Sequence, residues 1–219
     1  MLGFLRSQDK RRLRALRQDS HPVMQAYLST PFPQERDDWK TAKIVSLDFE
    51  TSGLDPQQDK LLSYGCVEIE RGSILFGSAG HEYIRSADLI PESSAVIHHI
   101  TDDTARAGRP LKEVLPLLLE RLSGKLLLVH YRRIELGFLD AVCRAFYGSP
   151  FVIPTIDTLE LAQRVLLPKD DRTGASQLRL FNLRDRYGLP KYSAHNAMYD
   201  AITTAELFLM LAAELSPRA

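Results

Sequence analysis

Apolar residues along the chain form short continuous runs in some places and helically spaced stretches in others. Residues 43–49 (KIVSLDF) form a run typical of a strand that is buried on both faces. Residues 61–84 contain two further strand-like segments around Arg71-Gly72, a pair suited to a tight turn, and so predict a hairpin.

Beyond the hairpin, helices and strands alternate. We expect helices over 91–101, 111–124, 134–148, 159–167, 178–188 and 195–215, and strands over 125–130 and 151–158. Pro116 could kink its helix, whereas Gly148 and Gly188 are expected to end theirs. Three antiparallel strands followed by alternating helices and strands predict an α/β fold with helices packed on a mixed sheet.

The first 40 residues differ from the rest and predict a helical N-terminal extension (1–40) to a main domain (41–219). Their basic residues lie among leucines, as expected of an amphipathic helix: Arg6, Lys10, Arg11, Arg12, Arg14 and Arg17 with Leu5, Leu13 and Leu16. A second short helix is expected over 22–28, followed by a proline-containing connector. The basic helix could contact nucleic acid or a partner, but we favour a solvated helix that packs through its leucines.

Charge and cysteine content narrow the possible classes of protein. The chain has 28 basic and 28 acidic residues, which argues against a protein that holds nucleic acid mainly by bulk positive charge. Cys66 and Cys143 match no zinc or redox spacing, so buried free thiols in a reducing cytoplasm are expected. The opening MLGFL is too short for a signal-peptide core, and no apolar run reaches membrane-spanning length.

Candidate chemistry begins with Asp48 and Glu50 in SLDFETSGLD. Side chains alternate along a strand, so both carboxylates should project to the same face. Two adjacent carboxylates repel unless a cation lies between them or one holds a proton, and Mg²⁺ or Mn²⁺ is the simplest such cation. The alternative is that Glu50 lies in solvent while Asp48 caps the next turn.

Three later residues extend this hypothesis. Glu135 begins a helix directly after an apolar strand, although alone it could be an ordinary solvent-exposed glutamate. His195 and Asp200 are five residues apart, which is about 140° of helical rotation, so they do not share a helix face. We expect His195 to precede the final helix or lie in its first turn. Asp200 should point inward beside the small Ala197 and Ala201.

These residues fall in three motifs that resemble the DnaQ-like (DEDDh) 3′–5′ exonucleases, a family that includes the proofreading epsilon subunit of bacterial DNA polymerase III. The motifs are LDFETSGLD, HYRRIELGFL and HNAMYD, and the resemblance spans roughly residues 43–211. In the second motif, Glu135 stands at the position of the family's aspartate and Tyr131 at that of its asparagine. IHHIT and IDTLELA also resemble family segments, and in the latter Asp157 is expected to support structure.

The resemblance implies a ribonuclease H-like fold with a mixed five-stranded sheet and a two-metal phosphodiester hydrolase acting at 3′ ends. Two Mg²⁺ or Mn²⁺ ions would be held by four carboxylates: Asp48, Glu50, Glu135 and Asp200. His195 would act as the general base. Glutamate at position 135 should preserve activity, with a possible change in metal preference.

Substrate contacts are expected from Thr51, Leu54, His98 and Tyr131. His98 could instead be structural, and Tyr131 with its neighbouring arginines could be a surface residue at a helix start. The favoured function is hydrolysis of single-stranded DNA from 3′ ends with release of nucleoside 5′-monophosphates. The alternatives are an exoribonuclease or oligoribonuclease, and a catalytically weak module that binds nucleic-acid ends. The expected partners are nucleic acid and a polymerase or repair protein, and no membrane contact is expected.

Overall fold

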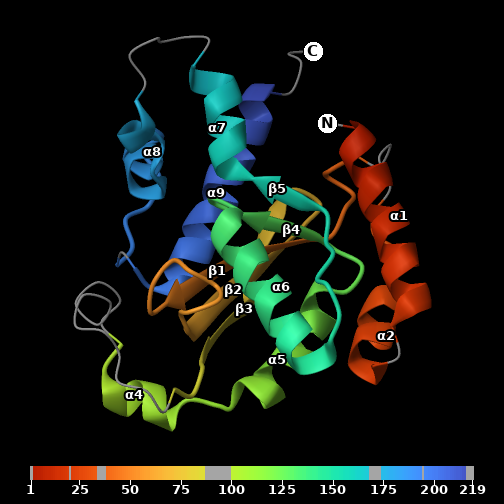
Figure 1. The fold of residues 1–219 in the computed structure, drawn as a ribbon. Helices are drawn as coiled ribbons and strands as arrows, with labels where there is room; N and C mark the ends of the chain where they lie inside the picture. The colour runs from red at the N-terminus through yellow and green to blue at the C-terminus, as the bar shows by residue number, and fades with distance from the viewer. Residues whose placement is uncertain are drawn as a thin grey trace.

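The computed structural model describes residues 2–19, 21–33, 38–86, 100–167, 174–193 and 195–215, with side chains from residue 8 onward. Within these ranges a five-stranded mixed sheet has the strand order β3-β2-β1-β4-β5 and carries helices on both faces (Figure 1). The strands are β1 (Ile44–Thr51), β2 (Leu61–Glu70), β3 (Ser73–Tyr83), β4 (Leu126–Val129) and β5 (Thr155–Asp157). The expected α/β architecture with a mixed five-stranded sheet is confirmed.

The sheet combines the antiparallel hairpin with parallel strands supplied later in the chain. β1 pairs antiparallel with β2 and parallel with β4, and β4 pairs parallel with β5. Arg71 and Gly72 connect β2 to β3 with φ values of 52° and 71°, as a tight hairpin turn requires. All but one residue of β1 are buried, because helices cover the strand on both sides.

The helices also follow the apolar pattern. They are α1 (Leu2–Gln18), α2 (Pro22–Ser29), α4 (Asp102–Ala107), α5 (Leu111–Leu122), α6 (Arg133–Tyr147), α7 (Thr158–Leu166), α8 (Leu180–Arg186) and α9 (Ala197–Leu215), with a 3₁₀ turn, η1 (Ala175–Leu178). Pro116 lies inside α5 without ending it, and Gly148 ends α6 with φ 67°. The helix expected over 91–101 lies almost entirely outside the described residues. No helix in the described ranges is both long and apolar enough to cross a membrane.

The N-terminal helices α1 and α2 lie together at one side of the molecule and share the main core (Figure 1). Tyr27 is 2% exposed; its ring stacks on Phe151 at 5.6 Å and its hydroxyl donates to the Val152 carbonyl at 2.9 Å. The boundary near residue 40 stays a prediction.

The side of α1 that packs inward differs from our expectation. Leu13 is 38% exposed and Leu16 only partly buried, whereas Arg12 is 4% exposed. Arg12 pairs with Asp9 and donates to the Leu28 carbonyl at the end of α2, both at 2.6 Å. A guanidinium can satisfy such a carbonyl and a leucine cannot, so one of the basic residues is structural. Among the side chains of α1 from residue 8 onward, the exposed basic ones are Lys10, Arg11, Arg14 and Arg17.

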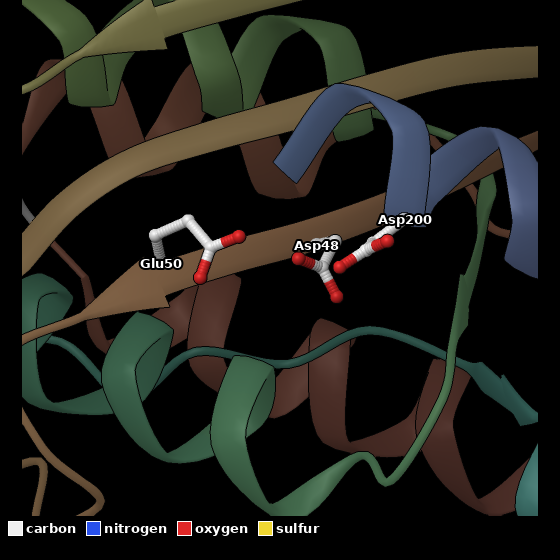
Figure 2. A group of neighbouring side chains, drawn as sticks. All are labelled: Asp48, Glu50 and Asp200. Atoms are coloured by element: carbon white, nitrogen blue, oxygen red, sulfur yellow. The ribbon is translucent and has the colours of Figure 1, made fainter. Parts of the chain in front are cut away.

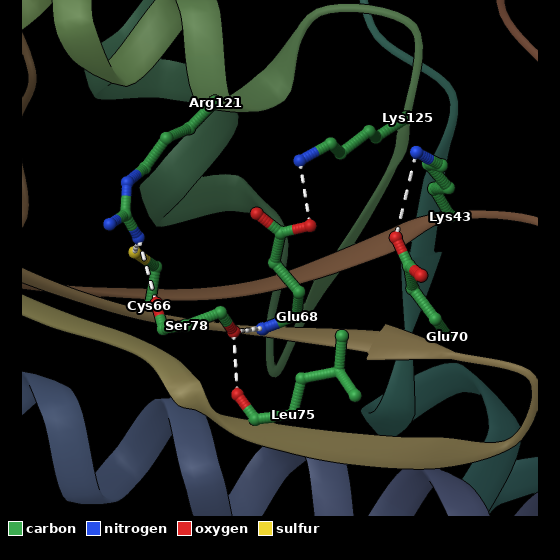
Figure 3. Close-up of polar contacts among 8 residues, drawn as sticks. All are labelled: Lys43, Cys66, Glu68, Glu70, Leu75, Ser78, Arg121 and Lys125. Carbon is green, nitrogen blue, oxygen red and sulfur yellow. Dashed lines mark hydrogen bonds and ion pairs between the residues drawn. The ribbon is translucent and has the colours of Figure 1, made fainter.

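A large bulge interrupts the pairing of β2 with β3. Between the pairs Glu68–Leu75 and Cys66–Gly80, one residue of β2 faces four residues of β3. Ser78 closes the bulge, since its hydroxyl accepts from the Glu68 amide and donates to the Leu75 carbonyl (Figure 3). The odd number of extra residues reverses which β3 side chains face which side of the sheet.

Candidate active site

Three carboxylates converge at the end of β1. Asp48 and Glu50 project from the same face of the strand, and Asp200 reaches them from the first turn of α9 (Figure 2). Each can offer a ligand oxygen such that all three oxygens lie within 4.8 Å of one another. Glu50 is 4% exposed and Asp200 6%, so these two are largely shielded from water, whereas Asp48 is partly exposed.

Small residues allow α9 to approach the sheet this closely. A Cβ on Gly65 of β2 would overlap the backbone of Ala197 and Met198 at the start of α9. Ala197 and Ala201 are fully buried, and Ser46 donates a 2.7 Å hydrogen bond to the Ala201 carbonyl. The first turn of α9, with Asp200, is thereby fixed against β1 and β2.

Glu135 is the fourth acidic candidate and comes from the first turn of α6. It is 3% exposed, and its Oε2 is buried without a hydrogen-bond partner among the described residues. It is not part of the compact group of three, but its charge acts on Asp48. Burial raises the pKa of Glu135 to about 8, and the charge of Asp157 adds to this shift.

Asp157 organises the backbone that leads into α6. Its carboxylate accepts hydrogen bonds from the amides of Tyr131 and Arg132, both at 3.0 Å, and from the Leu159 amide at 2.9 Å. One carboxylate therefore fixes the turn before α6, where Tyr131 has φ 72°, and caps α7. This agrees with the structural role expected for Asp157 and places Glu135 indirectly.

The electrostatics of the group favour a bound cation. The pKa of Asp48 is raised well above its usual value, first by burial and then by the charges of Asp200, Glu135 and Glu50. Carboxylate oxygens are the preferred ligands of hard divalent ions, and Oε2 of Glu135 is a buried acceptor with no hydrogen-bond donor in the part of the chain that the structure describes. The donor set therefore fits Mg²⁺ or Mn²⁺.

His195 precedes α9 by two residues, as the rotation argument predicted. It is exposed and has φ 56°, which is unusual for a residue other than glycine. Its ring packs edge-to-face against Phe181 of α8, with centroids 5.2 Å apart and planes at 69°.

The predicted substrate contacts lie in different environments. Thr51 is 6% exposed and its hydroxyl donates to the Gly53 carbonyl at 2.6 Å, whereas Leu54 is 77% exposed in the loop after β1. Tyr131 is 42% exposed beside the start of α6. His98 lies outside the described residues.

The structure adds His81 to the face that carries the carboxylates. Because of the bulge, Asp48, Gly65 and His81 form a row across β1, β2 and β3. The Nε2 atom of His81 is buried without a hydrogen-bond partner in the described part of the chain. Burial lowers the pKa of His81, and the charge of Glu50 opposes this shift. A simple register from the Arg71-Gly72 turn would have placed His81 on the other face, so the sequence did not reveal it.

Comparisons with known proteins point to the same family as the three motifs. The family model described as "Exonuclease" (RNase_T) matches residues 45–208, well over half of the chain. DNA polymerase III PolC-type of Thermotoga maritima is 33% identical over 171 residues, covering 77% of this chain and 12% of that protein. The corresponding Staphylococcus aureus protein is 27% identical over 176 residues, covering 80% of this chain. The chain thus spans about an eighth of the length of these relatives.

Solved structures share the fold. Escherichia coli Exonuclease I in complex with a dT13 oligonucleotide matches with a TM-score of 0.69 at 19% identity, covering 80% of this chain and 42% of that one. A zinc-bound form of the E. coli enzyme with single-stranded DNA gives a TM-score of 0.68 at 18% identity, covering 80% and 41%. With the family model matching across all three motifs, the chain belongs to the DnaQ-like exonuclease family.

Proposed function

We propose that this chain is a metal-dependent 3′–5′ exonuclease that hydrolyses phosphodiesters at the 3′ ends of single-stranded DNA and releases nucleoside 5′-monophosphates. The observation that carries the proposal is the convergence of Asp48, Glu50 and Asp200, with the buried Glu135 acting on the same group. Such a concentration of charge stabilises a fold poorly unless cations bind to it.

Asp48, Glu50, Glu135 and Asp200 would hold two ions, Mg²⁺ or Mn²⁺. When bound, such ions lower the pKa of a coordinated water and stabilise the charge that develops on the leaving 3′ oxygen. The protein fixes the oxygen donors in advance, because β1, α6 and α9 are each held by the contacts described above.

His195 would be the general base that accepts the proton of the attacking water on an imidazole nitrogen. An imidazole can exchange a proton near neutral pH, and the exposure of His195 leaves a path for the proton to reach solvent. The backbone before α9 keeps the imidazole outside the helix, whereas Asp200 points inward toward the other carboxylates.

The preference for DNA rests on the relatives. Exonuclease I was solved with DNA oligonucleotides, and the PolC-type relatives are DNA polymerases. Leu54 and Tyr131 offer exposed apolar surface in the loops after β1 and β4, where a terminal base could stack or pack. Thr51 and His98 would contact the same nucleotide. A polymerase or repair protein in the cytoplasm would be the partner.

An end-labelled digestion assay tests the proposal. Single-stranded DNA, duplex DNA and RNA are each incubated with Mg²⁺, Mn²⁺ or EDTA, and products are sized. We expect loss of 3′ nucleotides from single-stranded DNA with either metal and no reaction in EDTA. Metal-independent digestion, or none at all, would overturn the proposal, and faster digestion of RNA would replace DNA as the substrate.

The variant His195→Ala tests whether His195 is the general base. We expect the rate to fall by on the order of 10²–10⁴, while Mn²⁺ binding measured by calorimetry is retained because the four carboxylates remain. Full activity in this variant would remove His195 from the mechanism.

A further inference from the structure

The loop that carries His195 is anchored on α9 just before the histidine. The ring of Tyr192 stacks on Tyr199 in the first turn of α9, with centroids 5.5 Å apart and planes 6° apart. The Tyr192 hydroxyl also donates to Glu206 Oε1 at 2.9 Å. The backbone three residues before His195 is therefore fixed to the helix that supplies Asp200.

Arg184 of α8 joins this anchored loop to an aromatic ring. Arg184 is 8% exposed, and its Nη1 donates to the Tyr192 carbonyl at 3.4 Å. Its guanidinium carbon lies 5.2 Å from the ring centroid of Phe181, one helical turn earlier, within the range of a cation–π contact. This contact with Arg184 therefore limits the movement of the Phe181 ring.

Phe181 in turn contacts the imidazole of His195. The 5.2 Å centroid separation and 69° interplanar angle are those of an edge-to-face aromatic pair. The ring contact limits the orientations open to the exposed imidazole, and an orientation that points away from the attacking water removes the base from the reaction.

We propose that Phe181 is a positioning residue for His195, restricting the imidazole to orientations in which it can accept the proton of the attacking water. This inference rests on the proposed nuclease function. Phe181 acts through His195 and not on substrate, so its loss should lower kcat and leave KM unchanged.

Phe181→Leu removes the ring while keeping an apolar side chain, and Phe181→Tyr keeps the ring. We expect kcat to fall about tenfold in Phe181→Leu and to stay near the original value in Phe181→Tyr. Phe76→Leu is the matched control, because Phe76 is 59% exposed on β3 and its loss should change neither constant. A rise in KM alone would mean that Phe181 contacts substrate and would overturn the proposal.

A double-mutant cycle with His195→Ala separates positioning from a general structural effect. If Phe181 acts through the imidazole, Phe181→Leu should have no further effect on kcat when His195 is already alanine. An equal loss of activity in both backgrounds would overturn the proposal, since it would show that Phe181 acts by another route.

A spectroscopic readout keeps the inference separate from the proposed function. The His195 ring protons should shift in the NMR spectrum of Phe181→Leu, because the ring current of Phe181 is lost, and should not shift in Phe76→Leu. No shift would refute the contact even in an active enzyme. A clear shift in a chain without nuclease activity would instead refute the proposed function, and the catalytic role of Phe181 with it.

Discussion

Glu135 is a residue in the site whose protonation should be visible in the stability of the protein. Its pKa is raised from 4.5 to about 8 in the folded chain, so the folded state binds a proton that the unfolded state has released between these values. The contribution of Glu135 to the free energy of unfolding of the metal-free protein should therefore fall as pH rises from 4.5 to 8, by roughly 1.4 kcal/mol per pH unit at most. Urea unfolding in EDTA at several pH values measures this slope.

Glu135→Gln isolates the contribution of this carboxyl, because the variant cannot ionise there. His130 has the opposite effect on the pH dependence of stability. Burial lowers its pKa to about 4, so its contribution to the free energy of unfolding is lost as pH falls below 6.5. Both proteins contain His130, so its contribution cancels in the comparison, and the difference reports the ionisation of Glu135 together with its effect on Asp48. Identical pH slopes in the two proteins would contradict the assignment.

For single residues, the sequence was informative where the period of a strand or a helix determines which way a side chain points. Strand alternation correctly placed Asp48 and Glu50 on one face, and His195 precedes the final helix, which is one of the two places expected for it. Arg12 was misjudged, because its burial depends on a carbonyl that only the folded α1–α2 pair brings near. The sequence also held no sign that Phe181 contacts His195, since that contact joins α8 to the segment just before α9.

Asp157 connects two elements, and its removal should affect both. Asp157→Asn loses the charge and one acceptor that hold the amides before α6 and at the start of α7. We expect a loss of about 1–3 kcal/mol in the free energy of unfolding and reduced activity, because α6 carries Glu135. Asp103→Asn is the control: its side chain is 95% exposed in a surface ion pair, so little change is expected.

The contact between α9 and β2 depends on the missing side chain of Gly65. Gly65→Ala should push the first turn of α9 away from the sheet and displace Asp200, at a cost of about 1–3 kcal/mol. Thermal unfolding and the nuclease assay should both register the change. Gly77→Ala should be tolerated, since a Cβ there meets no atom within 4 Å. An unaffected Gly65→Ala protein would mean that α9 can move without consequence.

At the scale of the helices and strands, local sequence signals predicted which elements form better than where they end or how the strands pair. The strand expected over 151–158 pairs only at Thr155–Asp157, because Pro154 precedes it and has no amide to donate. The Arg71-Gly72 turn was correctly located, but the bulge in β3 was not foreseen. Its closure needs Ser78 and the distant Arg121, which donates to the Ser78 carbonyl at 3.0 Å (Figure 3).

At the scale of the molecule, the N-terminal helices should unfold together with the sheet. Tyr27→Phe would leave the carbonyl of Val152 buried without its donor, which should cost about 1–2 kcal/mol. The single tryptophan, Trp39, packs against Phe208 on the opposite side of the sheet and reports unfolding there. In Tyr27→Phe, the urea transition measured by Trp39 fluorescence and the one measured by far-UV circular dichroism should shift together. Separate transitions would instead make α1 and α2 an independent unit.

The bulge between β2 and β3 also affects whether two copies of the protein can associate through the edge of the sheet. β3 is the outermost strand on its side of the sheet, and Leu75 and Phe76 beside the bulge are 39% and 59% exposed. A regular outer strand with such side chains would offer a continuous row of amides and carbonyls to which another chain could add. The bulge interrupts that row and therefore disfavours association of two copies of the protein through β3. The same bulge turns His81 toward the carboxylates.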